Sequence, residues 1–481
     1  MGWIYLMDQQ SILFISALVI GFYMAWNIGA NDVANAIGTS VGSKALKLRQ
    51  AVVLAAVFEF CGALFVGSEV SGTIQKGIVS PDLFIGEPYV LAYGMMASLL
   101  SAGVWLQVAS YFGWPVSTTH TIVGAVLGFG AVYGGIDAVN WGSVNTIVMS
   151  WILSPLLGGA FAYIFFKFLS HRIFYHESPI KAVKRLTPFL VFWVVLILSM
   201  VTIFKGLKNL HLDLSFSQAI FFSVLVSLFS SLISRFLVRK FHVTSNLIEK
   251  KDWQDPRIIF SLEKVKKHLK QAQSRAKGDF YFSLESCLKK IVSFTEMLKK
   301  GKASTVNDSE GVIVEKVFIY LQILSAACMA FAHGANDVAN AIGPLAAIVS
   351  ILKTGAVSKI EALPLWILFL GGGGIVIGLA TWGWRVVDTI GKGITELTPS
   401  RGFVAEISAA TTILVASKLG LPVSTTHTLV GAVLGVGFAR GIGALNLNTI
   451  RDIVLSWVVT VPAGAGLAIA FFYILKGIFT L

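Results

Sequence analysis

The sequence has few charged residues and few cysteines for its length. Only 13% of its 481 residues are charged, whereas a soluble domain carries roughly a quarter. This composition excludes an ordinary water-soluble globular fold, and the mean hydropathy of +0.77 indicates a lipid environment. The three cysteines are widely spaced and form no C-x-x-C pair, so neither a disulfide framework nor a zinc site is expected.

Two further signals are missing. The N-terminus lacks the basic segment and the small-residue cleavage site of a removable signal peptide, so its first apolar stretch is expected to remain as a membrane helix. A credible set of nucleophile, base and orienting acid is also missing, because adjacent residues such as Thr119 and His120 do not face each other on a helix. We therefore expect no enzyme, and no cofactor is implied.

Long apolar runs dominate what is present. Residues 186–205 and 216–237 are examples, and a transmembrane helix needs roughly 20 apolar residues to cross about 30 Å of hydrocarbon. The chain is predicted to be an all-α polytopic membrane protein with the lipid bilayer as its solvent. The formal net charge of +13 then reflects Lys and Arg in cytoplasmic loops, so no nucleic-acid partner is expected.

Two sequence blocks occur twice. Residues 29–38, Gly-Ala-Asn-Asp-Val-Ala-Asn-Ala-Ile-Gly, recur unchanged as residues 334–343. Residues 115–121, Pro-Val-Ser-Thr-Thr-His-Thr, recur unchanged as residues 422–428. A Ser-Trp pair at 150 and 151 recurs at 456 and 457. Three collinear matches with nearly the same shift indicate an internal duplication.

Basic residues near the span ends predict the orientation of the chain. They follow the first span, at positions 44, 47 and 49, and the fifth span, between positions 167 and 185. Both loops are expected in the cytoplasm, which places the N-terminus outside and makes the second copy of the Gly-Ala-Asn-Asp helix run opposite to the first. The sequence thus predicts about twelve transmembrane helices in two inverted five-helix repeats with a two-helix insertion, and both termini outside the plasma (inner) membrane.

The expected organisation has four parts. They are a first inverted repeat (1–170), a linking loop with a two-helix membrane hairpin (171–238), a cytoplasmic helical insert (239–313) and a second inverted repeat (314–481). The insert is polar, and its apolar residues recur at a spacing that predicts amphipathic helices. These positions are Leu262, Val265, Leu269, Leu284, Leu288 and Ile291. A solvated linker domain explains this pattern, and a regulatory or lipid-surface role is the alternative.

Asp32 and Asp337 lie inside otherwise apolar spans. An ionisable residue at membrane depth costs at least about 2.5 to 3.5 kcal/mol, so such residues are usually functional and face the bundle interior. A packing face of small residues explains the Gly and Ala of the motif but not the aspartates, each of which lies between two asparagines. Carboxylate and amide oxygens favour a hard cation such as Na⁺. The predicted cation ligands are Asn31, Asp32, Asn336 and Asp337.

The Pro-Val-Ser-Thr-Thr-His block is typical of a helix start, where unpaired backbone N–H groups and the positive end of the helix dipole bind anions. In an inverted repeat, two such starts point at each other around one midplane cavity. A tetrahedral oxyanion fits these donors, and hydroxyls that satisfy their own helix are the alternative interpretation. The predicted anion-binding residues are Ser117, Thr118, Thr119, Ser424, Thr425 and Thr426, with Asn35 and Asn340.

The helices that follow these starts carry two more features. Four glycines at G-x-x-x-G spacing predict helix contact faces. They are Gly124, Gly128, Gly431 and Gly435. His120 and His427 are candidates for proton carriers, because histidine titrates near physiological pH, or for hydrogen-bonded structural residues.

The duplicated Gly-Ala-Asn-Asp-Val-Ala-Asn-Ala and Pro-Val-Ser-Thr-Thr-His signatures resemble those of the inorganic phosphate transporter (PiT) family. The resemblance covers residues 10–165 and 314–478. It implies symport of inorganic phosphate with Na⁺ or H⁺, a homodimer and a cytoplasmic central loop. The family's essential aspartates match Asp32 and Asp337. Its functional glutamates resemble Glu59 and Glu406, which the resemblance adds to the predicted Na⁺ ligands.

The Asn-Asp-Val-Ala-Asn form is similar to that of the sodium-coupled members and implies Na⁺ as the coupling ion. Because His333 precedes the second copy and some relatives carry sulfate, an H⁺-coupled phosphate or sulfate permease stays open as an alternative. An anion channel is a further alternative. The expected mechanism is alternating access around a midplane site between the two inverted repeats.

Overall fold

The computed structural model describes residues 9–204, 214–240, 256–274, 276, 278–299, 305–357, 363–384, 386–387 and 393–479. Within these ranges the chain is helical, and strand pairing is limited to two isolated β-bridges, Val79 with Val139 and Thr395 with Leu445. The prediction of an all-α fold is confirmed.

The described residues of the first half of the chain form eight α-helices. They are α1 (Gln9–Gly42), α2 (Leu48–Val66), α3 (Ser68–Lys76), α4 (Pro88–Tyr111), α5 (Thr118–Gly134), α6 (Trp141–Leu169), α7 (Pro179–Phe204) and α8 (Phe216–Lys240). Three short helical turns lie between them. These are η2 (Pro81–Phe84), η3 (Ile136–Ala138) and the π-helical η4 (Ser170–Phe174).

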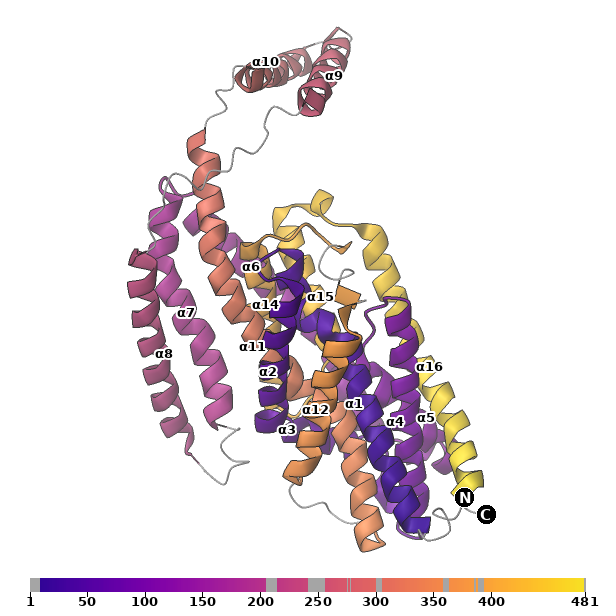
Figure 1. Ribbon diagram of the computed structural model, residues 1–481. Helices are drawn as coiled ribbons and strands as arrows, with labels where there is room; N and C mark the ends of the chain where they lie inside the picture. The colour runs from indigo at the N-terminus through magenta and orange to yellow at the C-terminus, as the bar shows by residue number, and fades with distance from the viewer. Residues whose placement is uncertain are drawn as a thin grey trace.

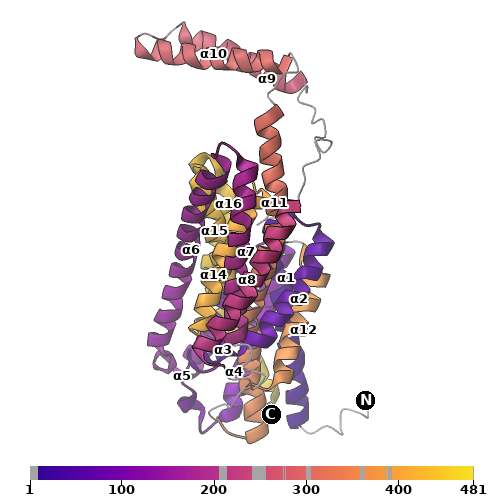
Figure 2. The ribbon, with the colours of Figure 1, turned by 90° about the vertical axis from the view of Figure 1, so that its left-hand side faces the viewer.

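The central insert and the second half follow. The insert holds α9 (Pro256–Gln273) and α10 (Asp279–Lys299), so the predicted amphipathic helices are confirmed. Both helices lie apart from the main bundle (Figures 1 and 2). The later elements are α11 (Thr305–Thr354), α12 (Leu365–Thr381), α14 (Pro399–Lys418), α15 (Thr425–Arg440), η7 (Ile442–Ala444) and α16 (Leu447–Phe479). The predicted boundary after residue 313 falls inside α11.

Eight helices of the described chain are long and apolar enough to cross a membrane. In the most apolar stretch of α7 only 17% of the residues are buried, and in that of α8 only 11% are. In the corresponding stretch of α4, 78% of the residues are buried. Because exposed apolar side chains need an apolar surrounding, α7 and α8 face lipid and α4 belongs to the interior. The chain is therefore an integral membrane protein, and the number of about twelve spans stays a prediction.

The two duplicated regions are interleaved. α2 packs on α11 and α12 packs on α1, while α5 packs on α16 and α15 packs on α6. α1 begins at the end of the bundle where α16 finishes, whereas α11 begins at the opposite end, so these two helices run in opposite directions (Figure 1). The centre of the bundle is consequently built from both halves.

Glycine allows these helices to approach closely. A Cβ atom added at Gly435 of α15 would lie 2.1 Å from the backbone oxygen of Gly159 in α6. One added at Gly128 of α5 would lie 2.7 Å from the Cα atom of Ala465 in α16. Both distances are much shorter than a van der Waals contact, so a side chain at either position would clash. The predicted glycine contact faces of α5 and α15 are confirmed.

Replacing Gly435 with alanine should therefore destabilise the bundle, because overpacking typically costs about 1–3 kcal/mol. We expect a lower melting temperature of the purified protein in detergent, followed by intrinsic tryptophan fluorescence. The matched control is Gly466→Ala in α16, where an added Cβ meets no described atom within 4 Å. Equal melting temperatures for the two variants would contradict the close packing of α15 on α6.

Candidate functional site

Asp32 and Asp337 lie at corresponding positions of α1 and α11. Their exposed fractions are 1% and 0%. The motif glycine three residues before each aspartate lets a neighbouring helix come close: a Cβ at Gly334 would lie 2.1 Å from the backbone oxygen of Glu59 in α2. The glycine thus positions α2 against α11, and both aspartates are enclosed by helices.

Asp32 accepts hydrogen bonds from both duplicated helix starts. Thr118, the first residue of α5, donates its hydroxyl to Asp32 Oδ2 at 2.8 Å, and Thr426 of α15 donates to Asp32 Oδ1 at 3.4 Å. Asn35, one turn further along α1, donates to Asp32 Oδ1 at 3.1 Å and to Thr426 Oγ1 at 2.8 Å. The carboxylate is therefore held by one hydroxyl from each half of the chain.

Asp337 has a corresponding environment. Thr425, the first residue of α15, donates its hydroxyl to Asp337 Oδ2 at 2.5 Å, as Thr118 does to the other aspartate. Asn340 reaches into the opposite half and donates to Thr119 Oγ1 at 3.2 Å. The polar contacts thus come in pairs that are related by exchange of the two halves.

Serine caps define the starts of α5 and α15. Ser117 accepts a hydrogen bond from the backbone N–H of His120 at 3.2 Å, and Ser424 accepts one from that of His427 at 3.1 Å. A helix start leaves four N–H groups without partners inside the helix, and each cap satisfies one of them. The serines therefore serve as N-caps in this structure, and further backbone donors lie at the same two starts.

The two helix starts touch each other directly. Thr119 donates its hydroxyl to the backbone oxygen of Val423 at 3.0 Å. The Thr426 hydroxyl oxygen lies 3.3 Å from the backbone oxygen of Val116, which is the alternative acceptor to Asp32 Oδ1 for its one proton. Each of these oxygens lies just before the start of the other helix. The positive ends of both helix dipoles are therefore directed into one region, next to the two aspartates.

The histidines of the two starts pack on each other. The ring centroids of His120 and His427 are 4.2 Å apart in an edge-to-face arrangement. Each ring also lies against a tryptophan, with centroid distances of 3.8 Å to Trp151 and 3.5 Å to Trp457. The two tryptophans belong to the repeated Ser-Trp pair of the sequence and, although only half-buried, hold α6 and α16 against the buried histidines.

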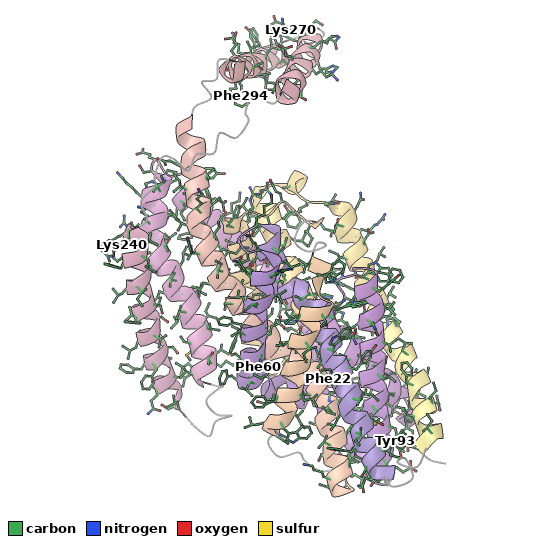
Figure 3. All side chains as sticks on the ribbon, viewed as in Figure 1. Phe22, Phe60, Tyr93, Lys240, Lys270 and Phe294 are labelled. Atoms are coloured by element: carbon green, nitrogen blue, oxygen red, sulfur yellow. The ribbon has the colours of Figure 1, made fainter. Side chains whose placement is uncertain are left out.

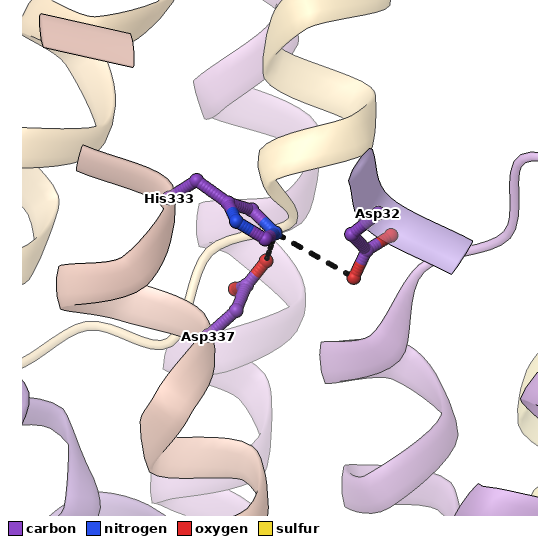
Figure 4. A group of neighbouring side chains, drawn as sticks. All are labelled: Asp32, His333 and Asp337. Atoms are coloured by element: carbon purple, nitrogen blue, oxygen red, sulfur yellow. Dashed lines mark ion pairs between the residues drawn. The ribbon is translucent and has the colours of Figure 1, made fainter. Parts of the chain in front are cut away.

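A histidine that sequence analysis did not assign to the site lies at its centre. His333 Nε2 is 3.0 Å from Asp337 Oδ2 and 3.8 Å from Asp32 Oδ2 (Figure 4). Its Nδ1 is 3.1 Å from Glu59 Oε1. The available signal was its position one helical turn before Asp337, on the same face of an apolar helix. The imidazole ring connects three carboxylates that come from three helices.

Several buried oxygens of the site have no hydrogen-bond partner among the described residues. They are Glu59 Oε2 and the amide oxygens of Asn31, Asn35 and Asn340. An unsatisfied buried acceptor costs about 1–3 kcal/mol, and such groups are normally satisfied by water or an ion. Oxygen acceptors without a proton to donate are the ligands that a hard cation prefers. The donor set therefore fits Na⁺.

Glu406 lies in a separate polar cluster. Its Oε1 accepts hydrogen bonds from Thr39 at 2.6 Å, Ser40 at 2.5 Å and Gln322 at 3.2 Å, and its Oε2 accepts one from Ser325. Its exposed fraction is 0%. Sequence analysis grouped this glutamate with the aspartates, whereas the structure surrounds it with hydroxyl and amide groups of α1 and α11.

Asn31 and Asn336 fix the segments that precede the helix starts. Asn31 donates to Ser110 Oγ at 3.0 Å and to the backbone oxygen of Trp114 at 3.1 Å. The amide of Asn336 lies 2.9 Å from Ser417 Oγ, the corresponding residue at the end of α14. Both asparagines therefore hold the chain that leads into α5 or α15, immediately beside the aspartates.

Lipid-facing helices around a buried ionic site define a class of protein. Buried carboxylates inside a membrane bundle mark ion or substrate pathways, and paired helix starts at this depth are a device for binding charged solutes. The chain has the architecture of a polytopic membrane transporter. Residues 28–468 match the phosphate transporter family, and the chain belongs to that family, which is one of transporters and not of enzymes.

Similar proteins support this assignment. A Chlamydia trachomatis protein named a phosphate permease is 45% identical over 468 residues, which cover 97% of this chain and 99% of the relative. The chloroplastic inorganic phosphate transporter 2-1 of Arabidopsis thaliana is 44% identical over 97% of this chain and 73% of its own length. A solved structure of a sodium-dependent phosphate transporter is 38% identical, with a TM-score of 0.77 and coverage of 97% of this chain and 99% of that chain.

The matched threonines of the site can be tested as a pair. Thr118→Val and Thr425→Val each remove a hydroxyl that hydrogen-bonds an aspartate while keeping the side-chain shape. A hydrogen bond to a charged group contributes about 1.5–3 kcal/mol, so each variant should lower phosphate uptake by roughly ten- to a hundredfold. The matched control is Thr412→Val, because Thr412 donates only within its own helix, to the Ser408 backbone oxygen. Normal uptake by either site variant would show that the hydroxyl it lacks is not part of the site.

Proposed function

We propose that the protein is a secondary active symporter that carries inorganic phosphate together with Na⁺. The observation that carries the proposal is the position of the predicted phosphate-binding hydroxyls. Thr118 and Thr425, at the two helix starts, donate to the aspartates that are the predicted Na⁺ ligands, Asp32 and Asp337. The anion site and the cation site thus share the same hydrogen bonds.

This sharing supplies a coupling mechanism. A threonine hydroxyl has a single proton to donate. While Thr118 donates to Asp32, its proton is not available to an anion. A Na⁺ ion that binds the Asp32 oxygens replaces this hydrogen bond and frees the hydroxyl for a phosphate oxygen. Binding of the cation therefore prepares the phosphate site, and the same argument holds for Thr425 and Asp337.

Electrostatic repulsion also makes phosphate binding depend on prior binding of the cations. Two like unit charges about 5 Å apart repel by roughly 3 kcal/mol at an effective dielectric constant of 20. A phosphate at the helix starts is exposed to this repulsion from both Asp32 and Asp337. Cations bound at the carboxylates offset it, so phosphate binds well only after the cations have entered.

The phosphate is proposed to bind between the two helix starts. Backbone N–H groups and the positive helix ends attract the anion, and hydroxyl and amide donors orient its oxygens. The matched contacts of the two halves suit a tetrahedral anion, which presents oxygens in all directions. The proposed ligands are Ser117, Thr118, Thr119, Asn35, Ser424, Thr425, Thr426 and Asn340.

Na⁺ is proposed as the coupling ion because of the oxygen atoms near the aspartates. The unpaired Glu59 Oε2 and Asn31 Oδ1 add to the carboxylates of Asp32 and Asp337 and provide the ligands of a hard cation. Asn336 completes the proposed ligands from the second half. The name of the structural neighbour, a sodium-dependent phosphate transporter, supports the same ion.

Glu406 is proposed as the centre of a second cation site. Its carboxylate and the hydroxyl oxygens of Thr39, Ser40 and Ser325 offer oxygen ligands, beside the Gln322 amide that also donates to Glu406. In the structure these hydroxyls donate to Glu406, so a cation that displaces their protons from the carboxylate turns the same oxygens into ligands. Thr39 and Ser40 lie in the last turn of α1, which ends at Gly42, so this proposed site is about two turns further along α1 than Asp32.

Alternating access is proposed to follow from the duplicated architecture. The opposite directions of α1 and α11 and the paired polar contacts support two inverted repeats, whose relative movement exposes the central site to one side and then to the other. We further propose a homodimer in the plasma (inner) membrane, with both termini outside and the α9–α10 insert in the cytoplasm, where loop arginines and lysines are enriched.

The coupling ion can be identified by uptake of radiolabelled phosphate into proteoliposomes that contain the purified protein. We expect an inward Na⁺ gradient to accelerate uptake, because Na⁺ frees the site hydroxyls, and an inward H⁺ gradient to have little effect. Excess sulfate should not compete. Acceleration by H⁺ alone would contradict Na⁺ as the coupling ion, and inhibition by sulfate would contradict specificity for phosphate. Equal rates without any gradient would favour a channel.

The aspartates should be required for the effect of Na⁺. Loss of about 3 kcal/mol of charge interaction corresponds to roughly a hundredfold weaker cation binding, so Asp32→Asn and Asp337→Asn should each abolish the Na⁺ stimulation of uptake. Asp137→Asn, at the exposed η3 turn, is the matched control and should transport normally. Equal melting temperatures would show that the variants are folded. Full Na⁺ stimulation in either site variant would contradict the assignment of that aspartate.

A further inference from the structure

The hairpin of α9 and α10 has a surface that the transport mechanism does not use. The two helices pack on each other, with half-buried leucines at helical spacing on both, such as Leu262 and Leu269 on α9 and Leu284 and Leu288 on α10. This pairing buries the apolar stripe that sequence analysis predicted. Val265 was counted in that stripe but is 43% exposed.

Large apolar side chains remain at the surface of the hairpin after this pairing. Phe282 is 67% exposed and Phe294 is 53% exposed, and Tyr281 lies beside the first of them at 40%. Figure 3 shows Phe294 on α10 and Lys270 on α9 at the surface of the hairpin. Exposed aromatic side chains of this size, on a helical pair that is otherwise polar, are typical of helices that lie in a membrane interface.

The charge of the hairpin is concentrated on α9. Its 18 residues include five basic residues and one acidic residue, whereas α10 has three of each. Lys266, Lys267 and Lys270 lie within two turns of one another. A helix with this excess of lysine is attracted to a surface of negative charge.

The chain keeps this basic hairpin near one face of the membrane. Five residues separate the end of α10 from the start of α11, and five residues reach at most roughly 18 Å. The candidate membrane span within α11 is Glu310–Thr354. α8, the membrane helix on the other side of the hairpin, ends in Arg239 and Lys240. The hairpin therefore lies at the basic end of the bundle, where anionic lipid headgroups gather on the cytoplasmic leaflet.

We propose that the α9–α10 hairpin docks on the anionic phospholipid headgroups of the bilayer in which the transporter is embedded. The lysines of α9 bind the headgroup phosphates, and Phe282, with Tyr281 beside it on α10, enters the interface. Figure 2 shows the hairpin axis lying across the direction of the bundle helices, which is the orientation that an interfacial helix adopts. This docking is independent of which ion or anion is transported.

A cysteine of the chain allows a direct test in the full-length protein. Cys287 is exposed on α10, whereas Cys61 is half-buried and Cys328 is buried. In the Cys61→Ser background, an environment-sensitive fluorophore on Cys287 reports the polarity around the hairpin. The labelled protein is placed in nanodiscs of phosphatidylcholine alone or of phosphatidylcholine mixed with phosphatidylglycerol.

We expect the emission to shift to shorter wavelength only in the discs that contain phosphatidylglycerol, and the shift to shrink as salt screens the headgroups. The triple variant Lys266→Gln, Lys267→Gln and Lys270→Gln should lose the shift. A matched control removes three basic residues at the same end of the bundle, Lys44→Gln, Lys47→Gln and Arg49→Gln, and should keep it.

The remaining outcomes overturn the proposal. Equal emission in both kinds of disc shows that the hairpin does not bind anionic lipid. A shift that the α9 triple variant retains, or that the control variant also loses, shows that the lysines of α9 do not form the docking surface. None of these results depends on phosphate uptake, so a failure here and a failure of the proposed symport are distinguishable.

Discussion

The two aspartates in the middle of the bundle are each bound by a hydroxyl at the start of a helix, and these hydrogen bonds impose the arrangement around them. A carboxylate buried in a membrane is strongly unfavourable unless charged or polar partners compensate it. Asp32 and Asp337 obtain partners from α5 and α15, which must therefore begin inside the bundle and not at its surface. Glycine contacts make this possible, because they let the surrounding helices approach to backbone distance. The same helix starts carry the donors that we propose for the anion, so the groups that compensate the aspartates are also the groups proposed to bind the substrate.

The central site is paired, but its His333 has no charged counterpart in the other half, and neither has Glu406 in the separate polar cluster. The position that corresponds to His333 in the first copy of the motif is Ile28, and the position that corresponds to Glu406, shifted by 307 residues like the second motif, is Leu99. Both are buried and apolar. The imidazole and its contact with Glu59 therefore act on one side of the paired site only. The two halves therefore differ in the charged groups around their aspartates, although their sequence motifs are identical.

The periphery of the molecule obeys different constraints from the centre. α7 and α8 present apolar side chains in nearly every direction and meet lipid on most of their surface. They add membrane area without contributing a residue to the site. The hairpin of α9 and α10 extends from the same part of the chain, and its lysines and exposed phenylalanines match the surface of the membrane and not its interior. We therefore propose that the insertion between the two duplicated regions acts at the bilayer surface, whereas the duplicated regions hold the buried polar site.

The sequence by itself determined the all-helical membrane fold, the duplication, the buried aspartates and the hydroxyl-rich helix starts. These follow from hydropathy, which the bilayer imposes on every span, and from motifs that are local in the chain. The tertiary structure alone decided which groups meet. Asn35 and Thr426 are 391 positions apart, and their hydrogen bond depends on how α1 and α15 pack. Packing likewise brought His333 between three carboxylates and moved Glu406 into a cluster of its own. Local patterns cannot specify such contacts, because each depends on the relative placement of helices from opposite ends of the chain.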